Sequence, residues 1–178
     1  MLRLRSGRAV LLVGVALVVV FAVALVAGLS FSSSTPTSSA GLRVGSPAPA
    51  WSGTSLTGQH LSSKAERGHW VVLNFFATWC TDCRTETPAL ERFAADHSPA
   101  QVRVVSVLYD DSVSDARTFA ADHHVRWPIL TTSPATAYDV ARVGLPETFV
   151  IDPQGRLADS RFGAVTVAVL DHDIAGSR

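Results

Sequence analysis

The chain has 178 residues and a formal net charge of zero. Three of its arginines precede Ala9, so the rest of the chain carries 12 basic residues against 15 acidic ones. This balance, without a block of basic residues beyond the N-terminus, argues against a nucleic acid as partner.

The N-terminal residues predict a membrane anchor. Residues 1–8 hold three arginines and no acid, and Ala9 to Leu29 runs for 21 residues without a charge. A helix of this length spans a bilayer core and exceeds the roughly 7–15 apolar residues of a signal peptide. The arginines place residues 1–8 in the cytoplasm and everything after Leu29 outside the cell membrane. Cleavage at Ala22-Val23-Ala24 is the alternative, but this pattern lies inside the apolar stretch, so we expect an uncleaved single-pass anchor.

A linker and one domain follow the anchor. Residues 30–49 are rich in Ser, Thr, Pro, Gly and Ala, with Arg43 as their one charge, which is typical of a tether rather than of a folded segment. Residues 50–178 have the size of a single domain. At its start, turn residues Thr54 to Gln59 lie between the apolar Trp51 and Leu61, which predicts a short N-terminal hairpin.

Two buried strands and two helices are expected next. Val71 to Phe76 is too continuously apolar for a half-exposed strand and suits the centre of a parallel sheet. Apolar residues recur at helical spacing between Arg84 and His97, where Pro88 should kink the helix without ending it. Val102 to Leu108 reads as a second buried strand, and Ser114 to His124 as a helix with Ser114 as its N-cap.

The remaining elements continue this alternation. We expect a brief strand at Ile129-Leu130 and a connecting helix at Pro134–Ala141. Two antiparallel strands joined by a β-turn follow at Thr148–Ile151 and Arg156–Phe162, and a closing helix at Val165–Ile174. This order indicates an α/β layered fold with a mixed sheet and right-handed crossovers. We find no internal repeat.

Cys80 and Cys83 are the two cysteines of the chain, and they lie between a predicted strand and a predicted helix. A disulfide across two intervening residues closes almost no loop, so it adds little stability and suits a bond that opens and closes. A helix start also favours a thiolate on the first cysteine. The alternatives are a small structural clip or half a zinc site, but zinc needs two further Cys or His ligands at comparable spacing. Haem attachment needs a histidine where Arg84 stands.

These residues together resemble a known family. The Trp79-Cys80-Thr81-Asp82-Cys83 motif, Pro88 and the segment Leu145 to Asp152 (LPETFVID) are similar to thioredoxin. More narrowly, Val72 to Cys80 (VLNFFATWC) resembles the TlpA-like membrane-anchored thioredoxins, which include the ResA and CcmG (DsbE) proteins of cytochrome c maturation. The resemblance covers Val44 to about Ile174. It implies a thioredoxin fold with a mixed central sheet flanked by helices, an N-terminal hairpin and a central helical insertion.

The resemblance assigns roles around the dithiol. Cys80 is the exposed nucleophile and Cys83 the resolving thiol, which expels the product from a mixed disulfide. Pro146 matches a cis-proline that lies against the dithiol, and the backbone of Leu145 is implied to pair with the client; an ordinary trans proline is the alternative. Trp79 is implied to shield the dithiol and to offer an apolar contact.

Two acids complete the candidate site. Glu86 lies one helical turn past Cys83 and matches a glutamate beside the active site of TlpA-like proteins; burial would raise the pKa of its carboxyl and let it move protons to the thiols. A solvated glutamate on the helix surface is the alternative. Glu147 is similar to an acid of the cytochrome-maturation members.

Asn74 departs from general thioredoxins, which carry an acid at that position. Asp82, between the cysteines, opposes thiolate formation and favours a weakly oxidising pair.

We therefore expect an extracytoplasmic protein-disulfide reductase. Its clients would carry Cys-x-x-Cys disulfides, with apocytochrome c as the leading candidate, and a membrane thiol-transfer protein would supply electrons. We expect no metal and no cofactor beyond the Cys80–Cys83 pair. The alternatives are a general oxidase or isomerase of exported proteins, a non-catalytic interaction module, and a peroxidase. The peroxidase would need a Thr-x-x-Cys spacing, whereas Thr78 stands at Thr-x-Cys.

Overall fold

The computed structural model describes residues 42–132, 134–135 and 137–176. The anchor predicted at Ala9–Leu29 and most of the predicted linker lie outside the described residues. Every helix within the described part of the chain is too short or too polar to cross a bilayer.

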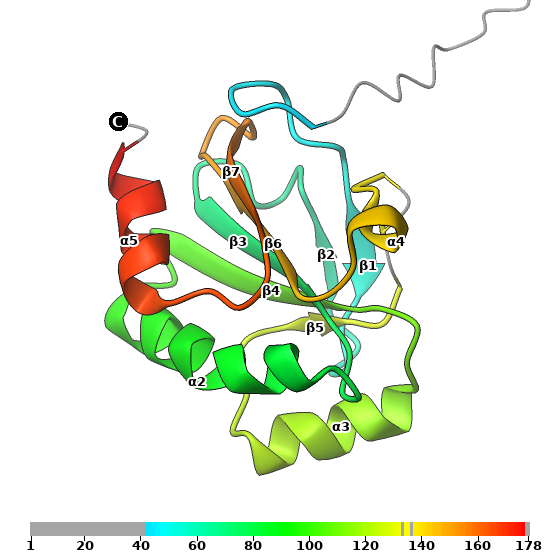
Figure 1. Cartoon of the computed structure of the whole chain (residues 1–178). Helices are drawn as coiled ribbons and strands as arrows, with labels where there is room; N and C mark the ends of the chain where they lie inside the picture. Colours follow the sequence, from blue (N-terminus) through cyan, green and yellow to red (C-terminus); the bar gives the residue numbers. More distant parts are fainter. Residues whose placement is uncertain (1–41, 133, 136, 177–178) are drawn as a thin grey trace, which may run out of the picture. The chain divides into compact units, whose positions relative to one another are not determined.

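A five-stranded mixed sheet forms the centre of this described part (Figure 1). The strand order is β5-β4-β3-β6-β7, in which β3 (Trp70–Phe76) pairs parallel with β4 (Val102–Leu108) and antiparallel with β6 (Glu147–Ile151). The outer strands are β5 (Ile129–Leu130) and β7 (Leu157–Phe162). The predicted α/β fold with a mixed sheet is confirmed.

The central strand β3 is buried on both faces, which explains its continuous apolar sequence. Val71, Leu73 and Phe75 belong to one part of the core, whereas Val72 packs in another with Leu90 and Phe93. These alternate residues point to opposite faces because successive side chains of a strand do so.

Helices and a hairpin cover the two faces of the sheet. Helices α2 (Thr81–Asp96) and α5 (Val167–Gly176) lie side by side on one face, and the antiparallel hairpin of β1 (Ser52–Thr54) and β2 (His60–Ser62) lies on the other (Figure 1). The predicted N-terminal hairpin is therefore confirmed. Helix α3 (Val113–Asp122) lies near the N-terminal end of α2.

Two predicted helix starts are wrong. Helix α2 begins at Thr81 rather than Arg84, because Cys80 is its N-cap and the Cys80 Sγ accepts the Cys83 N–H at 3.1 Å. Helix α3 begins at Val113, and its cap is Ser112 rather than Ser114: the Ser112 Oγ accepts the Asp115 N–H at 3.0 Å.

The helix predicted at Pro134–Ala141 is also wrong. Helix α4 covers Val140–Val143 alone, and the residues before it form turns in which the Ala137 N–H bonds the Pro134 carbonyl at 2.9 Å. Tyr138 is buried in the core and donates its hydroxyl to the Pro49 carbonyl at 2.8 Å. Asp139 has a φ of 57°, a left-handed conformation that interrupts a helix.

The closing helix starts two residues later than predicted. It begins at Val167 rather than Val165, because Thr166 caps it: the Thr166 Oγ1 accepts the Val169 N–H at 3.3 Å. The Val165 N–H, before the cap, is donated to the Glu86 carboxylate at 3.1 Å. Arg161 of β7 then bonds both carboxylate oxygens of Asp173, at 2.8 and 3.1 Å, and so joins α5 to the sheet edge.

Candidate active site

The dithiol lies at the junction of β3 and α2, where a buried strand delivers the chain to a helix start. Cys80 and Cys83 form a disulfide with an S–S distance of 2.11 Å. Cys80 is 7% exposed and Cys83 is 1% exposed, so Cys80 is the more accessible of the two sulfurs. After reduction, the Cys83 N–H and the positive end of the α2 dipole would favour a thiolate at Cys80.

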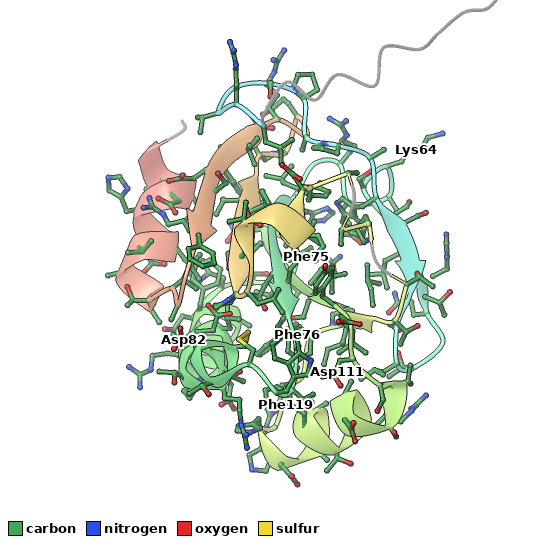
Figure 2. The ribbon with its side chains drawn as sticks, turned by 45° about the vertical axis from the view of Figure 1, so that its right-hand side comes forward. Lys64, Phe75, Phe76, Asp82, Asp111 and Phe119 are labelled. Atoms are coloured by element: carbon green, nitrogen blue, oxygen red, sulfur yellow. A yellow bond between two sulfur atoms is a disulfide. The ribbon has the colours of Figure 1, made fainter. Side chains whose placement is uncertain are left out.

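An apolar cluster supports the dithiol from below. It joins the two cysteines to Phe76 at the end of β3 and Phe119 of α3, whose ring centroids lie 5.4 Å apart (Figure 2). The cluster excludes water from the inner side of the disulfide, so exchange partners must approach Cys80 from the surface.

The loop that precedes Cys80 is held by the loop that follows β4. The Asp111 Oδ2 accepts both the N–H and the hydroxyl of Thr78, at 2.6 and 2.7 Å. The Trp79 Nε1 donates to the Asp110 carbonyl at 3.1 Å, yet the Trp79 side chain remains 60% exposed. The β4–α3 loop therefore positions both residues that precede the nucleophile.

Leu145 and Pro146 lie against the same region. The predicted cis peptide bond between them is confirmed. Leu145 packs on the apolar cluster that contains both cysteines, and the Pro146 carbonyl accepts the Gly163 N–H at 2.9 Å. The start of β6 and the end of β7 thus meet beside the dithiol.

Glu86 is a buried carboxyl, so the alternative of a solvated surface glutamate is wrong. Its side chain is 2% exposed and accepts hydrogen bonds from the Asn74 Nδ2 at 2.7 Å and the Val165 N–H at 3.1 Å. Burial raises the pKa of Glu86 to about 7; the two hydrogen bonds lower it, and the nearby charge of Asp82 raises it. A carboxyl with this pKa exchanges protons near neutral pH.

Glu147 is buried as well. It is 6% exposed at the first position of β6, where it is in register with Phe75 on one side and Phe162 on the other. Both acids predicted for the site, Glu86 and Glu147, are therefore buried. Glu86 lies in α2, and Glu147 lies at the start of β6, directly after Pro146.

Phe162 adds an apolar surface that the sequence did not single out. Its side chain is 64% exposed at the end of β7, one residue before the N–H that bonds Pro146. A Cβ added at Gly144 would lie 3.2 Å from the Phe162 Cε2, so this aromatic ring packs against the backbone just before Leu145. Phe162 therefore flanks the segment expected to meet a client.

Asp111 is the other residue that the sequence analysis missed. A signal existed: Asp110-Asp111 follows β4 after one residue, Tyr109, and the C-terminal ends of the parallel strands β3 and β4 lie at the same edge of the sheet. Within the described residues, no group of three or more His, Cys, Asp or Glu side chains is placed to hold a metal.

Comparisons with known proteins agree with this geometry. A sequence model described as the AhpC/TSA family matches residues 44–160. The thioredoxin-like protein YneN of Bacillus subtilis is 32% identical over 71% of this chain and 75% of its own length. The thiol-disulfide oxidoreductase ResA of the same organism is 29% identical over 72% of each chain. The crystal structure of a DsbF homologue from Corynebacterium diphtheriae superimposes with a TM-score of 0.65 and 27% identity, over 73% of this chain and 85% of that one.

Proposed function

The chain belongs to the thioredoxin-like AhpC/TSA family and is a thiol–disulfide oxidoreductase, and from this premise we propose that it reduces protein disulfides outside the cytoplasm. The observation that carries the proposal is the unequal exposure of the two sulfur-bearing residues, 7% for Cys80 and 1% for Cys83, so that a client reaches Cys80 first. We further propose that apocytochrome c is among its clients, because the VLNFFATWC and LPETFVID segments resemble the cytochrome-maturation members of the family.

The proposed reaction has two steps. The Cys80 thiolate attacks one sulfur of the client disulfide; a Cys80–client mixed disulfide forms, and the other client sulfur leaves as a thiolate that takes a proton. Cys83 then loses its proton and attacks the Cys80 Sγ, which releases the second client thiolate and closes the Cys80–Cys83 disulfide. Two electrons pass from the enzyme dithiol to the client disulfide.

Glu86 is suited to the second step. Cys83 is nearly inaccessible, so its proton needs an acceptor inside the domain, and the Glu86 carboxylate lies one helical turn away on the same helix. Because the pKa of Glu86 is raised to about 7, mainly by burial, the carboxyl can accept that proton and give it up again at neutral pH.

The surface around Cys80 suits a protein client. Trp79 and Phe162 are both more than half exposed, although large apolar side chains are usually buried. Together with the Leu145 backbone they can contact an extended client segment on either side of its cysteine. Glu147, buried between β3 and β7, supports the Pro146 segment that faces this client.

The charges near the dithiol favour a reductant over an oxidase. A strong oxidant depends on a highly stabilised thiolate, and the acids Asp82 and Glu86 disfavour negative charge at the neighbouring sulfurs. A peroxidase is disfavoured for two reasons: Thr78 stands at the wrong spacing before Cys80, and its hydroxyl is donated to Asp111 at 2.7 Å.

We propose that the apolar stretch Ala9–Leu29 anchors the domain to the membrane and that a membrane thiol-transfer protein recharges the dithiol.

The test is a trapping experiment with single cysteine variants. Cys83→Ser should accumulate mixed disulfides between Cys80 and its clients, because the nucleophile remains while the resolving thiol is gone. Cys80→Ser is the matched control and should trap none. Non-reducing gels with mass spectrometry would identify the clients, and trapping by Cys80→Ser alone would reverse the assigned roles. Trapping of many exported proteins without any apocytochrome c would support the general oxidase or isomerase instead.

A further inference from the structure

A buried network of polar side chains joins helix α2 to the central strands of the sheet, and Asn74 of β3 is at its centre. The Asn74 Nδ2 donates to the Glu86 Oε1 at 2.7 Å and to the Thr148 Oγ1 at 3.1 Å. The Asn74 Oδ1 accepts the Ser106 hydroxyl at 3.4 Å, and the Ser106 Oγ accepts the Trp127 indole N–H at 2.8 Å. Asn74, Ser106, Thr148 and Glu86 are each at most 3% exposed, so water does not replace these bonds.

The network has a single direction. An indole N–H can only donate, so the Ser106 Oγ accepts from Trp127, and the Ser106 hydroxyl gives its own proton to the Asn74 Oδ1. This contact fixes the amide with its NH₂ group toward Glu86 and Thr148. The chain of donors therefore ends on Glu86, which must accept at Oε1.

This direction decides which form of Glu86 the fold favours. The carboxylate anion accepts two N–H groups, from Asn74 at Oε1 and from Val165 at Oε2. Neither contact offers an acceptor for a carboxylic-acid proton, so both favour the charged form. Burial favours the neutral form, and the two opposing effects leave the group close to balance.

We infer that Asn74 is a positioning residue that keeps the buried Glu86 carboxylate able to ionise, and that Ser106 holds Asn74 in the orientation this requires. The inference deepens the proposed function, because it rests on Glu86 as the group that exchanges protons with Cys83. It also gives a physical reason for an amide at this place in β3: an acid there would share the 2.7 Å contact and oppose the ionisation of Glu86.

The other ionisable groups around Glu86 do not take this part. On its own helix they are Asp82, whose charge opposes ionisation of Glu86, and the two cysteines once reduced. Glu147 belongs to β6, and Asp173 of α5 is paired with Arg161. None of these side chains donates a hydrogen bond to the Glu86 carboxylate in the described residues, whereas Asn74 does.

The experiment titrates Glu86 directly in the full-length oxidised protein. The chain has four glutamates, so carboxyl-¹³C labelling of glutamate gives a simple NMR spectrum in which Glu86→Gln identifies the Glu86 signal. Asn74→Ala should raise the titration midpoint of Glu86 by about one to two pH units, the effect of losing one charge-assisted hydrogen bond. An unchanged or lower midpoint would overturn the inference.

Two further variants keep the inference testable if Asn74→Ala fails to fold. Ser106→Ala keeps Asn74 but removes the hydroxyl that bonds its Oδ1, so the amide can rotate. It should raise the titration midpoint of Glu86 by a smaller amount than Asn74→Ala, and no shift would contradict the orienting role of Ser106. Thr148→Val is the matched control, since it removes a partner of Asn74 that does not contact Glu86, and should leave the midpoint within a few tenths of a unit. A shift as large as that of Asn74→Ala would count against the inference.

The proposed function can fail separately from this inference. If Glu86→Gln leaves the pH profile of thiol–disulfide exchange unchanged, Glu86 does not accept the Cys83 proton and that part of the proposed function is wrong. The titration midpoint of Glu86 in Asn74→Ala would still test the inference about Asn74 independently.

Discussion

The contact between Thr78 and Asp111 joins two side chains that are far apart in the sequence and decides how Cys80 is presented. One carboxylate oxygen of Asp111 takes both hydrogen bonds that Thr78 can donate, and the other takes the Ser112 N–H at 2.7 Å. The loop before the nucleophile is thus tied at two atoms to the loop after β4.

Asp111→Ala should loosen this loop and separate protein clients from small disulfides. The loss of bonds to a carboxylate should cost about 1–3 kcal/mol of unfolding free energy. Exchange with a Cys-x-x-Cys-His peptide disulfide, which we expect to contact Trp79 as well as Cys80, should slow several-fold more than exchange with a small aromatic disulfide. Stopped-flow kinetics with both substrates would measure the two effects.

Asp110→Asn is the matched control for this variant. It removes the neighbouring charge but keeps the carbonyl that accepts the Trp79 N–H, and asparagine tolerates the positive φ of 46° at this position. If Asp110→Asn slowed the peptide substrate as much as Asp111→Ala, loss of local charge rather than loss of the Thr78 contact would be responsible.

At the scale of elements, the packing of α2 on the sheet makes fold stability depend on pH through Glu86. Burial, more than any other effect, raises the pKa of Glu86 from 4.5 to about 7 on folding, so between these pH values the folded state holds a proton that the unfolded chain has lost. The stability that this group contributes is therefore fully present below about pH 4.5 and is lost as the pH rises to about 7. The whole change amounts to about 3 kcal/mol.

Glu86→Gln should flatten this dependence. Glutamine has no proton to lose, so the fall in unfolding free energy between about pH 5 and pH 8 should be about 2–3 kcal/mol smaller than in the unaltered protein. Urea titrations of the oxidised protein at both pH values would measure it, with Glu91→Gln on the same helix as the control for loss of a helix carboxylate. A steeper fall in Glu86→Gln would contradict the buried, partly neutral state of this side chain.

The sequence predicted those elements whose residues carry their own signal. The strand Val71–Phe76 was recognisable because burial on both faces requires an uninterrupted apolar run, and the hairpin because turn residues separate its two arms. The helix expected at Pro134–Ala141 failed because Tyr138 turns into the core and Asp139 is left-handed, neither of which follows from local propensity.

The candidate site was predictable to the same extent. Cys80, Cys83 and Pro146 were identified from motifs of adjacent residues. The partners of Glu86 and Thr78 were not, since Asn74 lies 12 residues from Glu86 and Asp111 lies 33 residues from Thr78. Such contacts are decided by how α2 and the β4–α3 loop pack, which no short window of sequence contains.

At the scale of the whole molecule, the proposed anchor and linker would keep the reductant beside both its electron donor and its clients. The surroundings outside the cytoplasm oxidise thiols, so a reductant there has to be recharged. A strain that lacks the protein should therefore lose holocytochrome c and recover it when a small thiol is added, as read from haem-stained gels. Accumulation of reduced exported proteins with normal cytochromes would favour the oxidase instead.

The proposed location has its own control. Protease added to intact spheroplasts should remove the domain if residues after Leu29 lie outside the membrane. Full protection would contradict the proposed topology, whatever the cytochrome content of the deletion strain.

The short loop of the active-site disulfide, with two residues between its cysteines, makes equilibrium unfolding a measure of redox poise. Because so small a loop restrains the unfolded chain very little, the unfolded states of the oxidised and the reduced protein have nearly the same conformational entropy. A thermodynamic cycle then equates the difference between their unfolding free energies with the difference in reduction potential between the folded dithiol and an unstructured peptide. Each 1.4 kcal/mol corresponds to about 30 mV. For a reductant, the oxidised protein should unfold at a higher urea concentration than the reduced protein. The reverse order would identify an oxidant, and the measurement requires no client protein.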